Sequence, residues 1–535
     1  MWTERLPRAR AAALALAACF AFTGLGNHPL RASDEPRVAG IAWTMQHEGQ
    51  WLVPWLADQP FLEHPPLFYA LLGGFLKALG ATETVARLPS ALASFLTLWL
   101  CFELGRRLAG ARGGVAALLV LVGMRGFFRY SHKVLVDPLL ALCVLAGYAA
   151  YLHAAWSDAP QRSGGPSGRS APVPWLAVLG IYAAAALAFA VKGLVGVVLL
   201  GGPIAIDVLC FRGLRFTKSW AHPAGAVLLA GACLGYPAWL YRELGPAALH
   251  EFAVSNSLLR IFPTEGLAGV PYRGGHVNPF WYYLPRIFEQ LGWTVVLVPG
   301  AVAWLWRSAR AEGSSPGLRF LALVFPIGVL LLSIPGTKRG LYMLPLLPPL
   351  AVALGAWLAS LRREDPRRSR IEARIAAAQA PLLLVWISFA VSVGWNVLVY
   401  PHGGHSRDLG PVAREVVALT GPGPVTGYLL PEDIRGAIPF YTGRSIHSLR
   451  SEAEVARFVA ERPDGFLLVG KKAPDDLGGG ALARVRTWKK AEGANYILLR
   501  VAGSPSGRAP EYSEKTNSPS ASSNEGGGSR ADQRA

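Results

Sequence analysis

Carboxylates stand at the edges of two apolar segments of the chain. Asp34 and Glu35 follow the first apolar segment, and Asp137 opens a later one in the stretch RYSHKVLVDPLL. Ionisable residues are costly at membrane depth, so an acid that enters an apolar helix favours a functional role. Two carboxylates near one membrane surface supply a general base and a partner that orients or tunes it. From residue type alone, Asp34 and Glu35 are also explained as solvated acids at a helix start.

Several basic residues lie in turns on the predicted outer side of the membrane, where the positive-inside rule does not account for them. Such residues need another partner, and guanidinium and ammonium groups bind phosphate through charge-assisted hydrogen bonds. Each one alone is equally explained by a long side chain that reaches from an apolar helix to the membrane surface. We predict a phosphate site formed by Arg129, Lys133, Lys192, Arg260, Lys338 and Arg339.

The loop DEPRVAGIAWTMQHEGQWLVPWLADQPFLEHPP, residues 34–66, is rich in acids and aromatic rings. We expect Glu35, Glu63 and His64 to face the substrate in this loop. Glu63 and His276 offer a carboxylate and an imidazole, which are suitable ligands for a divalent metal ion. Their spacing is not diagnostic, and loop histidines are more often simply hydrogen-bonded. A divalent metal is therefore the one cofactor that the sequence suggests, without requiring it.

The composition is that of a membrane protein. The chain has 535 residues, of which 52% are hydrophobic and 16% charged, whereas soluble domains are about a quarter charged. The net charge of +18 does not indicate nucleic acid, because the arginine clusters lie between apolar runs. The five cysteines all fall inside apolar runs without a CxxC motif, so neither a disulfide framework nor a zinc knuckle is expected.

Hydropathy predicts a polytopic helical protein with about eleven or more membrane spans. Every second connection is basic, which places the amino terminus in the cytoplasm and everything after residue 400 outside. The apolar segment 66–80 breaks this alternation if it spans, so we expect an interfacial or re-entrant helix there. A cleaved signal peptide is the alternative for the first segment. The predicted spans are 11–26, 85–104, 113–128, 134–153, 174–191, 193–211, 221–241, 284–306, 318–334, 341–361 and 378–400.

Three regions follow from this pattern. Residues 1–400 form a transmembrane domain with extracytoplasmic loops at 34–80 and 243–283. Residues 401–503 alternate helical patterns with short strand patterns such as GFLLVG and NYILLRV, which indicates an extracytoplasmic α/β domain. Residues 504–535 are rich in serine, glycine and proline and are expected to be disordered.

The chain resembles the bacterial aminoarabinose (lipid A) transferases and their relatives in the protein mannosyltransferase-like superfamily. The resemblance rests on the acidic loop quoted above and on RLPSALASFL, VDPLL, AVKGLVGVVL, NPFWYYLPRI and KRGLYMLPLLPPLAVALG, and it covers roughly residues 1–400. It implies a glycosyltransferase of the C fold in a bacterial inner membrane. The aminoarabinose transferases usually read Glu-Lys-Pro-Pro where this chain has Glu63 and His64 before two prolines, which puts the donor sugar and the lipid A acceptor in doubt.

The resemblance also implies a reaction. A sugar on a polyprenyl phosphate is transferred to an acceptor by inverting displacement at the extracytoplasmic face. Asp34 matches the base or acceptor-orienting position, Asp137 the second acidic position, and Lys192, Arg260 and Lys338 the contacts to the donor phosphate. The acceptor is a lipid, a glycan or a protein, and membrane lipid surrounds the site. A flippase for a lipid-linked sugar, without transferase activity, is the alternative function, although the mid-span charges and internal repeat typical of transporters are few or absent.

Overall fold

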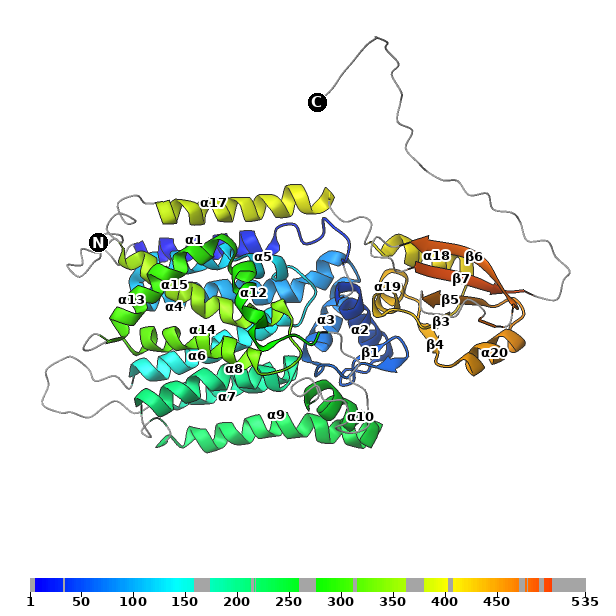
Figure 1. The fold of residues 1–535 in the computed structure, drawn as a ribbon, viewed down its shortest axis with the longest axis horizontal. Coiled ribbons are helices and arrows are strands. Elements are labelled where there is room, and N and C mark those ends of the chain that lie inside the picture. Colours follow the sequence, from blue (N-terminus) through cyan, green and yellow to red (C-terminus); the bar gives the residue numbers. More distant parts are fainter. Residues whose placement is uncertain are drawn as a thin grey trace, which may run out of the picture.

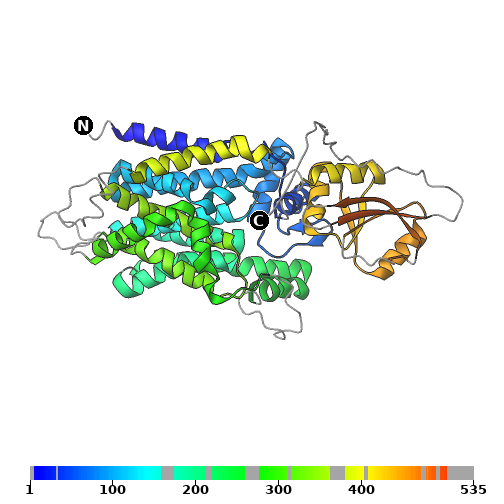
Figure 2. The same cartoon turned by 45° about the horizontal axis from the view of Figure 1, so that its top comes forward.

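The computed structural model describes residues 5–31, 34–157, 174–212, 216, 218–258, 276–310, 315–361, 380–402, 408–470, 477–478, 480–489 and 495–502. Long helices run side by side in a bundle, and a sheet with its own helices lies beyond one end of it (Figure 1). Helices α2 (Asp34–Glu48) and α3 (Leu67–Leu79) lie between the two, in this view and after rotation (Figure 2).

Most of the chain forms apolar helices. In the described ranges, eight helical segments are long and apolar enough to cross a membrane. The predicted spans 11–26 and 378–400 correspond to α1 and α17, which fall outside these eight. α1 begins with an arginine-rich turn, and α17 has only 15 residues before the helix continues with altered geometry. The helices of the bundle are α1 (Arg5–Phe22), α4 (Glu83–Gly123), α5 (Arg125–Tyr130), α6 (Asp137–Ser157), α7 (Trp175–Lys192), α8 (Leu194–Asp207), α9 (Ala221–Leu244), α12 (Tyr283–Leu291), α13 (Val298–Arg310), α14 (Pro316–Ser333), α15 (Leu347–Ser360) and α17 (Ala380–Gly394).

The longest segment, α4, is two helices joined at a sharp reversal. Gly110 has a φ of 76°, in the left-handed region that glycine adopts without strain. The helices on either side fold back on one another: a Cβ on Gly105 would lie 2.7 Å from the Gly113 carbonyl oxygen. A side chain at either glycine would push the two helices apart. The chain therefore forms separate helices where separate spans at 85–104 and 113–128 are predicted.

The loop between α1 and α4 is well structured. α2 starts at Asp34 and Glu35, where acidic side chains favour a helix N-terminus. It is followed by an antiparallel pair of two-residue strands, β1 (Trp55–Leu56) and β2 (Gln59–Pro60). The short apolar helix α3 then covers the segment for which an interfacial or re-entrant helix is predicted. A second group of short elements, α10 (Pro246–His250) and the π-helical η3 (Glu251–Leu258), follows α9.

The C-terminal part contains a five-stranded sheet of order β4-β3-β5-β7-β6, in which β3 pairs parallel to β4 and β5 and the remaining pairs are antiparallel. Helices cover both faces of the sheet, and successive residues of β5 face them in turn. Leu468 packs in the cluster that includes α18 and α19, whereas Leu467 and Val469 pack with α20. Its elements are α18 (Gly410–Thr420), β3 (Val425–Tyr428), α19 (Glu432–Thr442), β4 (Ile446–Leu449), α20 (Glu452–Glu461), β5 (Phe466–Gly470), β6 (Leu482–Lys489) and β7 (Asn495–Val501).

Candidate active site

Asp34 is held between two guanidinium groups at the start of α2. Its Oδ1 accepts a hydrogen bond from Arg37 Nη2 at 2.9 Å, and its Oδ2 accepts one from Arg339 Nη2 at 3.0 Å. Burial alone would raise the pKa of Asp34, but the charges of Arg339 and Arg37 outweigh burial and lower it. Asp34 is therefore a carboxylate at neutral pH. The two ion pairs stabilise the charged form of Asp34 and so make it a weak base.

Glu35, the neighbouring acid, has a structural role. Arg87 Nε donates to its Oε1 at 3.1 Å, and the same oxygen accepts the Val134 amide at 3.1 Å. The other oxygen accepts the Arg31 amide at 2.8 Å. Glu35 is 1% exposed, so this network ties the start of α2 to α4 and to the turn before α6. Its contacts indicate an anchor for Asp34 rather than a group that faces the substrate.

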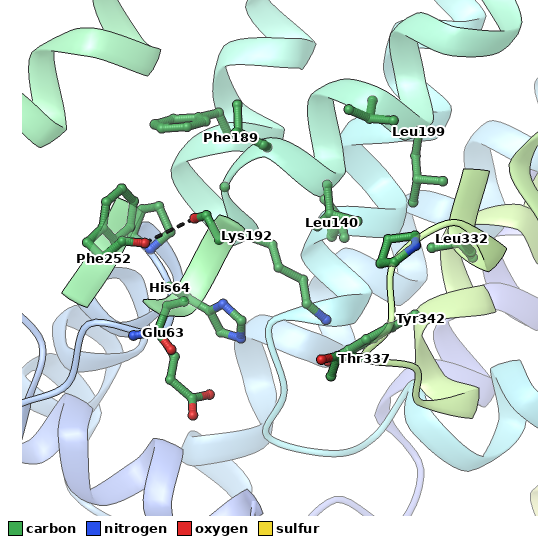
Figure 3. A pocket seen from close by; sticks show the side chains of 18 of the residues that line it. Glu63, His64, Leu140, Phe189, Lys192, Leu199, Phe252, Leu332, Thr337 and Tyr342 are labelled. Atoms are coloured by element: carbon green, nitrogen blue, oxygen red, sulfur yellow. Dashed lines mark hydrogen bonds between the residues drawn. The ribbon is translucent and has the colours of Figure 1, made fainter. Parts of the chain in front are cut away.

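Asp137 and Lys192 form a buried ion pair at one end of a cavity. Asp137 begins α6, Lys192 ends α7, and the ammonium donates to Asp137 Oδ1. The Lys192 nitrogen also lies 4.5 Å from the centre of the Tyr342 ring, a cation–π distance. Figure 3 shows the Lys192 side chain extending into the cavity toward Thr337 and Tyr342. Both predicted site residues thus line one cavity.

The cavity has a polar end and a long apolar wall. Its volume is about 400 Å³. The polar end, besides the ion pair, is lined by Glu63 and His64 from the loop before α3 (Figure 3). The apolar wall is built by α8, α9 and the end of α14, all of them candidate membrane spans. A cavity of this shape suits a molecule with a charged head and a hydrocarbon tail. The wall is lined by Leu194, Val195, Val198, Leu199, Cys233, Pro237, Leu331, Leu332 and Ile334.

The remaining predicted phosphate ligands lie in different places. Arg129 pairs with Glu289 at 3.3 Å. Lys133 lines a second, much smaller cavity of about 20 Å³ together with Arg129 and Glu35. Burial lowers the pKa of Lys133, and the nearby carboxylates of Glu35 and Asp34 offset this only in part. Arg260 lies outside the described residues.

Lys338 is buried beside the turn that carries Arg339. Its ammonium donates to the Asn278 carbonyl at 3.0 Å and to the carbonyl of Pro335, and its amide donates to the His276 carbonyl at 2.9 Å. Burial lowers the pKa of Lys338. These bonds tie the segment before α12 to the turn after α14. The Lys338 ammonium contacts described here are to the backbone, whereas its neighbour Arg339 reaches Asp34.

Of the two predicted metal ligands, Glu63 is among the residues that line the cavity and His276 is not. The charge of Glu63 also reaches a second acid. The pKa of Glu251 is raised, mainly by burial and to a lesser extent by the charge of Glu63. Within the described part of the chain, no three histidine, cysteine, aspartate or glutamate side chains gather as metal ligands. The metal site at Glu63 and His276 stays a prediction.

Two arginines essential to this geometry were not identified from the sequence. Arg37 follows Asp34 by three residues on a helix, a spacing at which side chains meet, so a signal was present. Arg87 stands inside an apolar run, which itself points to a buried partner. That partner, Glu35, is 52 residues away in the sequence, so only the fold identifies it.

Known proteins resemble this chain over parts of it or over most of its length. Residues 63–236 match the family described as dolichyl-phosphate-mannose-protein mannosyltransferase. Two solved structures share the overall architecture. ArnT from Cupriavidus metallidurans bound to undecaprenyl phosphate has a TM-score of 0.70 at 18% identity and covers 93% of this chain and 99% of its own. The oligosaccharyltransferase of Archaeoglobus fulgidus, in its apo form, has a TM-score of 0.56 at 12% identity and covers 86% of this chain and 69% of its own.

This chain has the C-type glycosyltransferase fold. Among curated proteins, it is similar to the undecaprenyl phosphate-alpha-4-amino-4-deoxy-L-arabinose arabinosyl transferase 1 of Sodalis glossinidius, with 31% identity over 61% of this chain and 54% of that protein. The corresponding transferase 2 of Pseudomonas fluorescens strain Pf0-1 is 27% identical over 74% of this chain and 67% of its own length. The chain thus aligns with only about half to two thirds of these relatives. The resemblance inferred from the sequence is confirmed.

Proposed function

We propose that this protein is a membrane glycosyltransferase that moves a sugar from a polyprenyl-phosphate donor to an acceptor at the extracytoplasmic face. The observation that carries the proposal is the cavity, which has the Asp137–Lys192 ion pair at one end and an apolar wall formed by candidate membrane spans. A lipid phosphate fits it with the phosphate near Lys192 and the hydrocarbon chain along α8 and α9. The relatives are named as transferases that use such a lipid, which supports the same chemistry here.

In an inverting displacement, the basic residues act on the leaving phosphate and the carboxylate of Asp34 acts on the acceptor hydroxyl. The acceptor oxygen attacks the anomeric carbon, forming a new C–O bond while the bond from that carbon to the lipid phosphate breaks. Lys192 and Arg339 stabilise the negative charge that grows on the leaving phosphate. Asp34 accepts a hydrogen bond from the acceptor hydroxyl and aligns it, and the proton leaves to solvent or to Asp34. Asp137 holds the Lys192 ammonium in place. That Arg129, Lys133, Arg260 and Lys338 contact the donor phosphate stays a prediction.

The proposed orientation places the Asp34 end of the bundle outside the cytoplasm of a bacterial cell. Arg10 and Arg106 both pair with Glu103, at 2.9 Å and 2.6 Å. These arginines therefore gather close to the reversal in α4, and in Figure 1 the start of α1 lies at the end of the bundle away from the sheet. By the positive-inside rule this end is cytoplasmic. The loop 34–80 and the C-terminal sheet then face the extracytoplasmic side of an inner membrane, with eleven spans in all.

The proposal also covers the classes of donor sugar and acceptor. A lipid A acceptor with an aminoarabinose donor is the version that the relatives suggest. His64 stands where those enzymes usually carry a lysine, so a side chain that can be neutral replaces a fixed positive charge, which suits a less charged substrate. We therefore include neutral and amino sugars on the donor side, and lipid, glycan and protein on the acceptor side.

The test uses the purified full-length protein in lipid nanodiscs with a panel of radiolabelled polyprenyl-phosphate sugars and a bacterial membrane extract as the source of acceptor. We expect release of free polyprenyl phosphate from one donor, and loss of that release in Lys192→Met. Glu48→Gln, at the exposed end of α2, is the matched control and should release it normally. In proteoliposomes, a flippase would instead move intact labelled lipid across the bilayer without release, and that result would replace the transferase with the alternative function.

A further inference from the structure

The C-terminal part contacts the first loop at the helix that carries Asp34. Helices α2 and α19 cross at two glycines. A Cβ on Gly40 would lie 2.3 Å from the Gly436 Cα, and one on Gly436 would lie 2.2 Å from the Pro36 carbonyl oxygen. Backbones approach this closely only where neither helix carries a side chain. The crossing brings Glu432, one turn before Gly436, next to Arg37, one turn before Gly40.

The Arg37 guanidinium is shared between the two parts of the chain. Its Nη2 donates to Asp34 Oδ1 at 2.9 Å, and its Nη1 donates to Glu432 Oε2 at 2.6 Å. The guanidinium is a rigid planar fork, so a shift of one carboxylate moves the partner of the other. Arg37 also lies under the Phe61 ring, 5.3 Å from its centre. Burial acts to lower the pKa of Arg37, but the carboxylates of Glu63, Glu432 and Asp34 raise it above its usual value.

Further bonds hold the C-terminal part against this loop on both sides of α2. Before the helix, the Leu30 amide donates to the Tyr441 hydroxyl at 3.1 Å. After it, Arg435 Nη2 donates to the Leu56 carbonyl at 2.8 Å. The first loop and α19 therefore form one packed unit, and Glu432 has a defined position relative to Asp34.

We propose that Glu432 is a positioning residue for the transfer reaction: through Arg37 it holds the Asp34 carboxylate in the orientation that meets the acceptor. The inference rests on the proposed function and adds to it that the C-terminal part belongs to the catalytic machinery. Glu432 does not line the donor cavity, so its loss slows turnover without weakening donor binding.

The experiment measures steady-state donor turnover by the full-length protein with Glu432→Gln. We expect kcat to fall about tenfold, the scale of energetic coupling between contacting groups, while the donor KM stays unchanged. The side chain of Glu432 is 46% exposed, so the variant should fold normally. Glu461→Gln, at the exposed end of α20, removes the same charge from the same part of the chain and should leave kcat unchanged.

A double variant separates positioning from a structural effect. If Glu432 acts through Arg37, then Glu432→Gln has no further effect on kcat in an Arg37→Gln background. A full additional loss in that background, a rise in KM alone, or wild-type kcat for Glu432→Gln would each overturn the inference while wild-type turnover remains. Absence of turnover by the wild type with every donor would instead overturn the proposed function, and the inference with it.

Discussion

Replacing Arg87 with methionine tests how the start of α2 is held. In the native protein this guanidinium bonds to both oxygens of Glu35, at 3.1 Å and 3.4 Å. It also donates to the carbonyls of Leu25 at 2.7 Å and of His28 and Pro29 at 2.9 Å. Arg87 is 0% exposed and Glu35 1%, so water cannot replace these partners. Among the residues that the structure describes, the variant leaves the buried carboxylate with two backbone amide donors, those of Arg31 and Val134.

The expected loss is large. Removing one partner of a buried ion pair costs about 3–5 kcal/mol, because the other charge stays buried without compensation. In the wild type, burial acts to raise the pKa of Glu35, but Arg87 outweighs burial and lowers it. Glu35 therefore stabilises the fold at pH values above its unfolded pKa, and this stabilisation is lost as the pH falls through its folded pKa. Without Arg87 burial dominates and the folded pKa rises above the unfolded one. The variant then loses stability as pH rises, so its deficit is greater at pH 8 than at pH 5.

The assay is reversible unfolding in mixed micelles, followed at both pH values. Arg106→Met is the matched control on the same helix, since its pair with Glu103 is partly exposed and should cost no more than about 1 kcal/mol. Combining Arg87→Met with Glu35→Gln should recover part of the loss, because the buried charge is then absent. An Arg87→Met loss as small as the control's, or one independent of pH, would refute this account of the network.

Two further predictions concern the active site. Arg339→Gln removes one of the guanidinium groups that lower the pKa of Asp34, so the acid limb of the kcat/KM profile should move to higher pH; an unmoved limb would mean that another group titrates there. Val198→Trp adds bulk to the apolar wall of the cavity from a half-exposed position, so it should raise KM for long-chain donors about tenfold or more while donors with short chains are unaffected. An equal rise for both donors would place the lipid chain elsewhere.

Local sequence patterns predicted the helices and some of the residues that line the candidate site. Hydropathy and the arginine pattern located the helices of the bundle, and the acids Asp34 and Asp137 proved to lie beside the predicted cations Arg339 and Lys192. These predictions depend on side chains that are unusual for their local surroundings, which a sequence displays directly.

The rest of the site depends on distant contacts. Nothing in the sequence distinguishes Asp34, which is partly exposed, from Glu35, which is fully buried, because the difference arises from Arg87 on another helix. Likewise, the partner of Arg37 on α19 is 395 residues away, and it follows only from the close crossing of two helices. Such partners are set by tertiary packing, to which local charge and hydropathy patterns are insensitive.

Donor binding and turnover by Asp34→Asn, measured side by side, test the central claim most directly. The substitution keeps the shape of the side chain and removes its charge, and Asp34 does not line the donor cavity. We predict that the variant binds the labelled polyprenyl-phosphate sugar within about threefold of wild-type affinity and loses at least about a hundredfold in turnover, the scale of general acid–base catalysis. Turnover at the wild-type rate would contradict the role of Asp34, and loss of binding together with turnover would place Asp34 in the donor site instead.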